Sequence, residues 1–379
     1  MKKKHVLSVV GARPNFMKMA PLLRELSKEE IFHSSLVHTG QHYDEVMSNV
    51  FFRDLNMQAP DFNLNVGSGS HAVQTAEIMK SFERVCDEAK PDLVIVAGDV
   101  NSTLACSLTA VKLQIPVAHL EAGLRSFDRT MPEEINRIVT DSISDVLFTT
   151  EESGNVNLRR EGIAEEKIHF VGNTMIDSLV SCAGLLHHTR LGGALGALDG
   201  AAYFLATVHR PSNVDDPGPL SQVLDILESA SQFAPVLFVT HPRTRNRLEE
   251  IGRASELSEI DDRLGEIRQG SVYFLPPLPY LEFFKLMSKC AAVLTDSGGI
   301  QEETTFLRIP CLTMRDNTER PSTVELGTNQ LVGLDEPAVR SCLKTIIDGE
   351  WKVSSVPPFW DGRAAERAVE VLKKVFGRD

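Results

Sequence analysis

The chain has 379 residues, of which 42% are hydrophobic and 24% charged, as in an ordinary globular protein. This length exceeds what one hydrophobic core usually organises, so we expect two domains. The formal net charge of −13 argues against nucleic acid or an anionic membrane as the partner. No apolar run approaches the roughly 20 residues that a membrane span requires.

The first half alternates short apolar runs with longer amphipathic segments. Strands are predicted at 5–10, 33–38, 92–97, 116–120, 145–149 and 168–171. Helices are predicted, among others, at 16–28, 44–54, 72–89, 102–113 and 134–143. This alternation of strand and helix is typical of a doubly wound parallel sheet.

The second half repeats the pattern after a stretch rich in Gly and Ala, residues 183–201. Strands are predicted at 202–207, 235–240, 272–275, 291–295 and 311–314, and helices at 217–231, 279–288, 299–307 and 336–347. We therefore expect an α/β protein of two Rossmann-like domains, residues 1–172 and 173–358, with the last helix, 363–376, packing back on the first. Ligands of such sheets bind at the carboxyl ends of the strands, which predicts a site in the interdomain cleft.

The start of the chain and its cysteines indicate the cytoplasm. The apolar run at 5–10 is too short for the core of a signal peptide. The six cysteines form no CxxC pair, so we expect buried, reduced thiols. No ligand spacing indicates a metal site or a cofactor.

Charged side chains follow the first predicted strand. Gly11 supplies a tight turn, and Arg13 and Lys18 supply two cations at the start of a helix. Helix amides with Arg and Lys suit a diphosphate. The segment is neither a Walker loop nor GxGxxG, and an ordinary turn with a solvated Arg13 is the alternative.

Carboxylates occupy further strand ends and a helix start in the first half. Asp99 and Glu121 each end a strand of buried type, and Glu133 and Glu134 begin a helix. Such a set suggests general acid and base chemistry. A helix cap is the alternative for Asp99, and compensation of the helix dipole is the alternative for Glu133 and Glu134. Neither alternative accounts for Glu121.

The second half carries matching motifs at its strand ends. His209 and Arg210 follow the first strand, where they could hold a phosphate and move a proton, and His241 follows the next strand. Ser297, Gly298 and Gly299 join a strand to a helix, and the bare glycines would let phosphate oxygens approach backbone amides. Glu303 lies about one turn further, within reach of ribose hydroxyls.

Taken in chain order, these motifs resemble those of the non-hydrolysing UDP-N-acetylglucosamine 2-epimerases. The matching segments are GARPNFMKMAPL, TGQHYDEVM, GDVNSTLA, HLEAGLRS, MPEEINR, VGNTMID, TVHRPSN, LTDSGGIQEE and TMRDNTERP. They span nearly the whole chain. The resemblance implies the glycosyltransferase-B arrangement of two Rossmann-like domains.

The resemblance also implies roles for individual residues. The catalytic residues would be Asp99, Glu121, Glu133 and His209. The UDP-binding residues would be Arg13, Lys18, Ser297, Gly298, Gly299 and Glu303, with the uracil near Pro276 and Pro277.

Two departures from the family pattern have consequences. The segment after His209 is changed to Arg-Pro-Ser-Asn. An allosteric pocket of bacterial members is matched by Gln41, His42 and His241, but Asp44 replaces a Gln, and residues 66–71 lack an Arg. We therefore predict weak or absent cooperativity in substrate.

The activity implied is the interconversion of UDP-N-acetylglucosamine and UDP-N-acetylmannosamine, without cofactor or metal, in a cytoplasmic homodimer that supplies a precursor of cell-surface polysaccharide. Two related outcomes stay open: hydrolysis to N-acetylmannosamine and UDP, and 2-epimerisation of a UDP-2,3-diacetamido uronic acid. A glycosyltransferase fits less well, because HLEAGLR and PEEINR belong to the epimerases. A non-catalytic nucleotide-sugar sensor would be expected to lose some of the carboxylates, and all are present.

Overall fold

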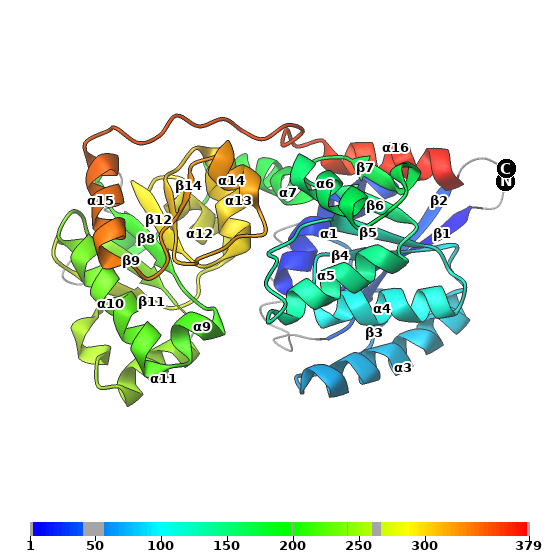
Figure 1. Ribbon diagram of the computed structural model, residues 1–379, viewed down its shortest axis with the longest axis horizontal. Coiled ribbons are helices and arrows are strands. Elements are labelled where there is room, and N and C mark those ends of the chain that lie inside the picture. Colours follow the sequence, from blue (N-terminus) through cyan, green and yellow to red (C-terminus); the bar gives the residue numbers. More distant parts are fainter. Residues whose placement is uncertain are drawn as a thin grey trace. The chain divides into compact units, whose positions relative to one another are not determined.

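The computed structural model describes residues 3–40, 57–196, 198, 200–240, 242–259 and 267–376. The chain divides into two compact units. Unit 1 comprises Met1–Cys182 and Pro358–Asp379, and unit 2 comprises Ala183–Pro357 (Figure 1). The helix predicted at 44–54 lies outside the described residues.

Unit 1 is built on a parallel sheet with the strand order β3-β2-β1-β4-β5-β6-β7. Its strands are β1 (Lys4–Val10), β2 (Phe32–His38), β3 (Phe62–Asn63), β4 (Leu93–Ala97), β5 (Val117–Ala122), β6 (Val146–Thr149) and β7 (Ile168–Phe170). Its helices are α1 (Arg13–Leu26), α3 (His71–Ala89), α4 (Asn101–Lys112), α5 (Pro132–Ile143), α6 (Glu152–Arg160), α7 (Thr174–Ala183) and α16 (Ala364–Phe376), with a short 3-10 turn at Glu165–Lys167.

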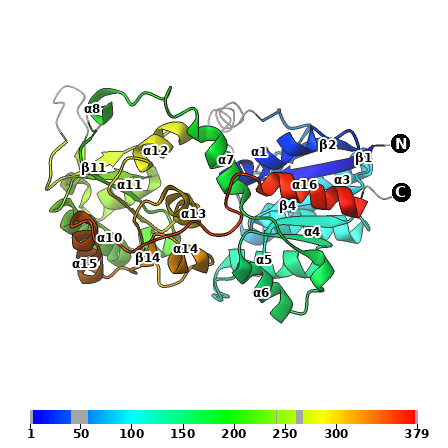
Figure 2. The same ribbon diagram turned by 90° about the horizontal axis from the view of Figure 1, so that it is seen from above.

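The helices of unit 1 cover both faces of the sheet. Helices α3, α4 and α5 lie side by side in one layer, where Phe82 and Cys106 pack against Leu7 and Val94 of the strands. Helices α1 and α16 pack together on the other face (Figure 2). The wholly apolar β4 and its buried neighbours account for the parallel, two-sided sheet that the sequence predicts.

The last helix belongs to unit 1, because α7 holds it there. The Asp177 carboxylate of α7 accepts hydrogen bonds from the backbone N–H groups of Ala364 and Ala365, at 3.1 and 2.7 Å, and so satisfies the first turn of α16. Helix α7 is itself tied to α1, since the Ser178 hydroxyl donates to the Met17 carbonyl at 2.5 Å. Packing of α7 places the boundary between units at Cys182 and Ala183, ten residues after the boundary expected from the sequence.

Unit 2 has a second parallel sheet, with the order β10-β11-β9-β8-β12-β13-β14. Its strands are β8 (Phe204–Thr207), β9 (Val236–Val239), β10 (Ser258–Glu259), β11 (Val272–Leu275), β12 (Ala292–Thr295), β13 (Cys311–Thr313) and β14 (Asn329–Leu331). Its helices are α8 (Gly193–Gly196), α9 (Pro211–Val214), α10 (Pro217–Ser231), α11 (Pro242–Glu250), α12 (Tyr280–Met287), α13 (Gly298–Leu307), α14 (Pro321–Glu325) and α15 (Glu336–Ile347), with a 3-10 turn at Ala254–Glu256.

Most predicted strands are present within one or two residues of their expected bounds. No strand is predicted at β3, β10 or β14, because two or three residues are too few to show a period.

In unit 2 the core lies between the sheet and helices α10 and α15, where Leu224 and Leu343 pack with Phe204 and Phe238.

Both sheets reverse their direction of winding at one point, between β1 and β4 in unit 1 and between β8 and β12 in unit 2. Doubly wound sheets bind ligands at the carboxyl ends of the strands beside this switch point. Gly11 and Asp99 follow β1 and β4, and His209 and Ser297 follow β8 and β12. The predicted motifs therefore lie at the switch point of each unit.

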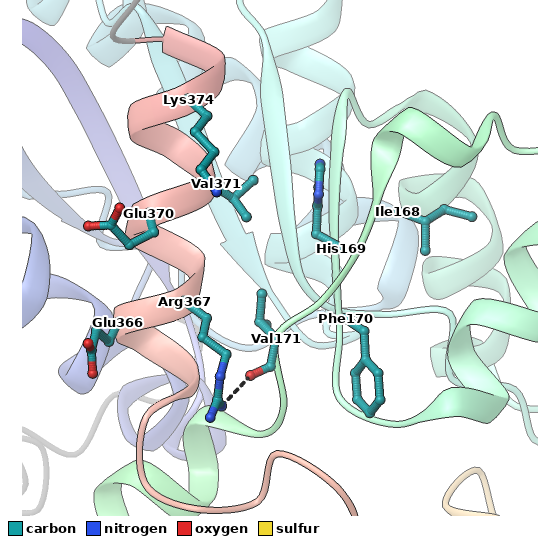
Figure 3. Close-up of a pocket in the computed structure, with 9 residues that line it drawn as sticks. All are labelled: Ile168, His169, Phe170, Val171, Glu366, Arg367, Glu370, Val371 and Lys374. Atoms are coloured by element: carbon teal, nitrogen blue, oxygen red, sulfur yellow. Dashed lines mark hydrogen bonds between the residues drawn. The ribbon is translucent and has the colours of Figure 1, made fainter.

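A shallow pocket of about 400 Å³ lies in unit 1 between β7 and α16 (Figure 3). His169, Arg367 and Lys374 are among its lining residues, and Arg367 donates to the Val171 carbonyl at 3.0 Å. None of the predicted site residues lines it. Among the described residues, no helix is both long and apolar enough to cross a membrane.

Candidate functional site

At the switch point of unit 1, helix α1 turns two polar side chains toward the end of β4. Asn15 accepts from the Ala12 N–H at 3.0 Å and donates to the Ala97 carbonyl at 2.6 Å. One turn further along, buried Lys18 forms a hydrogen-bonded ion pair with buried Glu121. Gly98, at φ +67°, faces this group, because a Cβ there would lie 3.0 Å from Lys18 Nζ and 3.3 Å from Glu121 Oε2.

Glu121 has an unusual backbone conformation at the end of β5. Its φ of +73° lies in the left-handed region, and the register between β5 and β6 shifts between Leu120 and Ala122. A side chain held in this region costs on the order of 1–3 kcal/mol, and such strain gathers at functional sites. At this irregularity of the strand the Glu121 carboxylate contacts Lys18.

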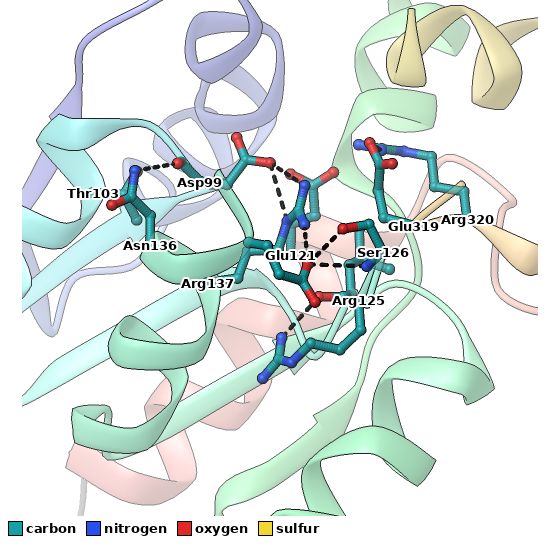
Figure 4. A network of polar contacts seen from close by, with 12 residues as sticks. Asp99, Thr103, Glu121, Arg125, Ser126, Asn136, Arg137, Glu319 and Arg320 are labelled. Atoms are coloured by element: carbon teal, nitrogen blue, oxygen red, sulfur yellow. Dashed lines mark hydrogen bonds and ion pairs between the residues drawn. The ribbon is translucent and has the colours of Figure 1, made fainter. Parts of the chain in front are cut away.

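Asp99 is joined to helix α5 by Arg137 (Figure 4). Arg137 donates to Asp99 Oδ2 from Nη2 at 2.7 Å and from Nε at 3.1 Å, while Asn136 donates to the Asp99 carbonyl at 2.8 Å. The Asp99 side chain is 24% exposed, so it is oriented by the protein and still open to solvent.

Glu134 is a buried structural carboxylate. It accepts from Arg137 Nη1 at 2.7 Å, from Ser126 N–H at 2.9 Å and from Phe127 N–H at 3.0 Å. It thereby fixes the loop after β5, including Phe127 at φ +60°. Glu134 thus has its own structural role, beyond the helix-dipole effect that the sequence alone would suggest.

Glu133, in contrast, is half-exposed in the first turn of α5. No hydrogen bond or ion pair of its side chain is recorded with the described residues. The structure therefore connects Asp99 and Glu134 through Arg137, and Glu133 is not part of this group in the described part of the chain.

Behind these carboxylates lies a fully buried polar network. His119 of β5 contacts Asp141 Oδ1 at 2.6 Å through Nδ1 and the Gly98 carbonyl at 2.8 Å through Nε2. Asp141 Oδ2 pairs with Arg125 at 2.7 Å. Burial by itself would raise the pKa of Asp141, but His119 and Arg125 hold the pKa below its usual range.

At the switch point of unit 2, several hydrogen-bond donors surround the side chain of Asp296. This buried carboxylate accepts from the backbone N–H groups of His209 and Arg210 at 3.1 and 2.8 Å, and from Asn213 Nδ2 at 3.0 Å. It also lies 3.1 Å from His209 Nδ1. Burial tends to raise the pKa of Asp296, but the His209 contacts and the backbone donors lower it.

The contact with Asp296 holds one side of the His209 ring. Its side chain is 58% exposed, while the ring nitrogen Nδ1 faces the buried carboxylate. A carboxylate behind one ring nitrogen fixes the ring and leaves the other nitrogen for a ligand. Asp296 lies within the motif LTDSGGIQEE, from which no role was predicted for it; its position directly after the buried strand β12 is the signal that could have identified it.

The start of helix α13 combines bare glycines with a cluster of arginines. A Cβ at Gly298 would lie 2.5 Å from Arg320 Nη1 and 2.9 Å from Glu319 Oε1, so a side chain here would have to displace these groups. Arg320 pairs with Glu302 at 2.8 Å, and Arg315 pairs with Glu319 at 2.9 Å. The amides of the first turn and these cations suit an anionic ligand.

Glu303 lies one turn into α13 and is buried. Its Oε1 accepts a hydrogen bond from the Tyr280 hydroxyl at 3.1 Å. Burial raises the pKa of Glu303 to about 7, although the Tyr280 hydrogen bond acts in the opposite direction. Pro276 and Pro277 follow β11, and Pro276 is exposed.

We expect the pKa of Glu303 to make stability depend on pH. The folded carboxyl holds its proton up to about pH 7, whereas the ordinary value is 4.5. Between these values the native state binds more protons than the unfolded state, so the free energy of unfolding falls as the pH rises, by up to about 3 kcal/mol. In the Glu303→Gln variant the free energy of unfolding should not show this decrease with rising pH. Denaturant titrations at pH 5 and pH 8 would measure it, and identical pH dependence in both proteins would contradict the assignment.

Some predicted residues are not described structurally. The side chain of Arg13 and residues Gln41, His42 and His241 lie outside the described part, as does Asp44. In the part of the chain that is described, no three His, Cys, Asp or Glu side chains are grouped so that they could hold a metal ion.

Two Rossmann-like units, each with its polar motifs at the switch point of its sheet, define the glycosyltransferase-B type of fold. A lipopolysaccharide outer core galactosyltransferase shares this fold, with a TM-score of 0.50 at 13% identity over 99% of this chain. The chain belongs to the UDP-N-acetylglucosamine 2-epimerase family, whose model matches residues 24–373.

Relatives in archaea and bacteria are similar over nearly their full length. The chain is 42% identical to the UDP-N-acetylglucosamine 2-epimerase of Methanocaldococcus jannaschii over 96% of this chain and 97% of that protein. It is 38% identical to the UDP-2,3-diacetamido-2,3-dideoxy-D-glucuronate 2-epimerase of Pseudomonas aeruginosa over 98% and 99%. A crystal structure of the M. jannaschii enzyme in complex with UDP-GlcNAc and UDP has a TM-score of 0.86 at 40% identity, covering 98% of this chain and 99% of that one.

Proposed function

We propose that this protein interconverts UDP-N-acetylglucosamine and UDP-N-acetylmannosamine at carbon 2 of the sugar. The observation that carries the proposal is the match to the family over residues 24–373 together with Asp99, Glu121 and Glu133 near the carboxyl end of one sheet. The M. jannaschii relative was crystallised with UDP-GlcNAc and UDP.

The nucleotide is assigned to unit 2. Ser297, Gly298 and Gly299 would bind the diphosphate through the amides of α13. Glu303 would accept hydrogen bonds from the ribose hydroxyls, and Pro276 would lie against the uracil. We retain Arg13 as a further phosphate ligand, whereas the pairing of Lys18 with Glu121 suggests that Lys18 orients this carboxylate.

The reaction is an elimination followed by an addition. The carbon-2 proton is not next to a carbonyl group, so simple deprotonation is unfavourable. A carboxylate takes this proton while the C1–O bond breaks, and the bonding electrons leave with UDP. The resulting 2-acetamidoglucal receives a proton on the opposite face of carbon 2, and a UDP oxygen returns to carbon 1.

The protein supplies groups for each step of this sequence. Asp99, Glu121 and Glu133 provide acids and bases, each positioned by a different element. His209, oriented by Asp296, would donate a hydrogen bond or a proton to the departing diphosphate, and the α13 amides would stabilise its charge.

A proton NMR time course with UDP-N-acetylglucosamine in deuterium oxide tests the proposal. We expect UDP-N-acetylmannosamine to form, with deuterium at carbon 2 of both sugars. Free N-acetylmannosamine with UDP would show instead that water captures the intermediate. Absence of exchange and of product would refute the proposed activity.

The similarity to the P. aeruginosa enzyme supports one second candidate, a UDP-2,3-diacetamido uronic acid as substrate. Its 2-epimerisation would use the same carboxylates, because the reacting carbon is the same. Comparison of kcat/KM for the two sugar nucleotides distinguishes them.

A further inference from the structure

We infer that Asp141 and His119 form a buried positioning pair that fixes both turns carrying the proposed catalytic carboxylates Asp99 and Glu121. This inference rests on the proposed function. Neither residue of the pair is exposed, so neither can touch a substrate. Their effect on the reaction must pass through the backbone that they hold.

The first contact reaches the turn after β4. His119 Nε2 lies 2.8 Å from the Gly98 carbonyl, directly before Asp99 in the chain. Gly98 is at φ +67°, and its N–H donates to the Leu120 carbonyl at 3.0 Å. The imidazole therefore helps to set the peptide plane from which the Asp99 side chain extends.

The second contact reaches the turn after β5. Asp141 Oδ2 accepts from the Gly123 N–H at 3.0 Å, two residues after Glu121. Asn157 donates to the Gly123 carbonyl at 2.9 Å. The left-handed conformation of Glu121 is thus held from both sides, by Lys18 at its side chain and by Asp141 at the following turn.

One carboxylate consequently links both turns, because Asp141 Oδ1 holds His119 at 2.6 Å while Oδ2 holds Gly123. Asp141 lies on α5, the helix whose first turn carries Glu133. The arrangement fixes three proposed catalytic residues relative to one another. A displacement of about 1 Å at such residues can cost roughly 100-fold in rate.

Two substitutions of His119 separate its two contacts. The amide nitrogen of Gln reaches about as far as Nε2, and that of Asn about as far as Nδ1. His119→Gln therefore keeps the contact with Gly98, and His119→Asn keeps only that with Asp141. We expect kcat to be roughly tenfold or more lower in His119→Asn than in His119→Gln, with UDP affinity within about twofold of wild type in both, because UDP is assigned to unit 2.

His5→Gln is the matched control. His5 of β1 also uses both ring nitrogens, contacting the Ala89 carbonyl and Ser35 Oγ at 2.9 Å each, and it lies at the start of its strand, away from the switch point. Its kcat should not change. Equal kcat in the Gln and Asn variants of His119, or a parallel loss of UDP affinity, would overturn the inference.

Asp141→Asn provides a second test if the His119 variants fail to fold. We expect kcat to fall while UDP affinity stays unchanged, and an unchanged kcat would overturn the inference. Crystal structures of the folded variants give a readout that does not depend on turnover. In His119→Asn and Asp141→Asn we expect Glu121 to leave φ near +73° or Asp99 to lose its contact with Arg137. If both persist, the pair does not position these residues, whether or not wild type epimerises the sugar.

Discussion

Replacement of the three proposed catalytic carboxylates by amides should reduce turnover by roughly 10²–10⁴-fold. The variants are Asp99→Asn, Glu121→Gln and Glu133→Gln. An amide keeps the shape of the side chain but cannot act as a base. Rates of epimerisation and of deuterium incorporation at carbon 2 measure the effect, with UDP affinity as the control for binding.

The structure predicts different costs in stability for the three variants. Glu133→Gln should have almost no effect on stability, because the side chain is half-exposed and forms no hydrogen bond or ion pair with the residues that the structure describes. Asp99→Asn weakens a partly exposed pair with Arg137 and should cost about 1 kcal/mol. Glu121→Gln leaves Lys18 buried without its carboxylate, for which roughly 3 kcal/mol or more is expected.

Glu152→Gln is the control for Glu133→Gln. Glu152 is an exposed glutamate in the first turn of α6, so it shares the helix-dipole environment of Glu133 without lying at a proposed site. The turnover of the Glu152→Gln variant should equal that of wild type. Normal turnover in all three carboxylate variants would show that these residues are caps and dipole partners, and the proposed mechanism would then be wrong.

Asp296→Asn should lower kcat by roughly 10²–10⁴-fold, because the carboxylate orients the ring of His209. Backbone N–H groups and Asn213 also point at its two oxygens. An amide nitrogen cannot accept these bonds, and unsatisfied buried donors cost about 1–3 kcal/mol each. Kinetics and denaturant titration at pH 7 measure the two effects.

The lowered pKa of Asp296 adds a test by pH. The ionised carboxylate stabilises the fold at pH values above its ordinary 3.8, and this contribution is lost as the pH falls through the lower folded pKa. The difference in stability between wild type and Asp296→Asn should therefore shrink in acid.

Asp335→Asn is the matched control for this substitution. Asp335 caps α15 by accepting from the Ala338 N–H at 3.0 Å, and Asn is an equally good cap. We expect its stability and kcat to be unchanged. A normal kcat in Asp296→Asn would exclude Asp296 as the residue that orients His209.

The sequence determined the architecture because the signals for it are local. Short apolar runs alternating with amphipathic segments predict parallel strands and covering helices, and the motifs after Val10, Ala97 and Thr295 fall at strand ends. The same motifs, read in order, indicated the family, which the comparisons confirm. The motifs that contribute to each proposed site could therefore be predicted from the sequence alone.

Only the tertiary structure decided which partners these residues have. Lys18 meets Glu121, and His209 meets Asp296, across 103 and 87 residues of chain, because the strand order brings their ends together. The two adjacent glutamates of α5 show the same limit of prediction from sequence. Successive helix residues point about 100° apart, so the docking of α5 buries Glu134 and leaves Glu133 half-exposed, a difference that their identical chemistry in the sequence could not reveal.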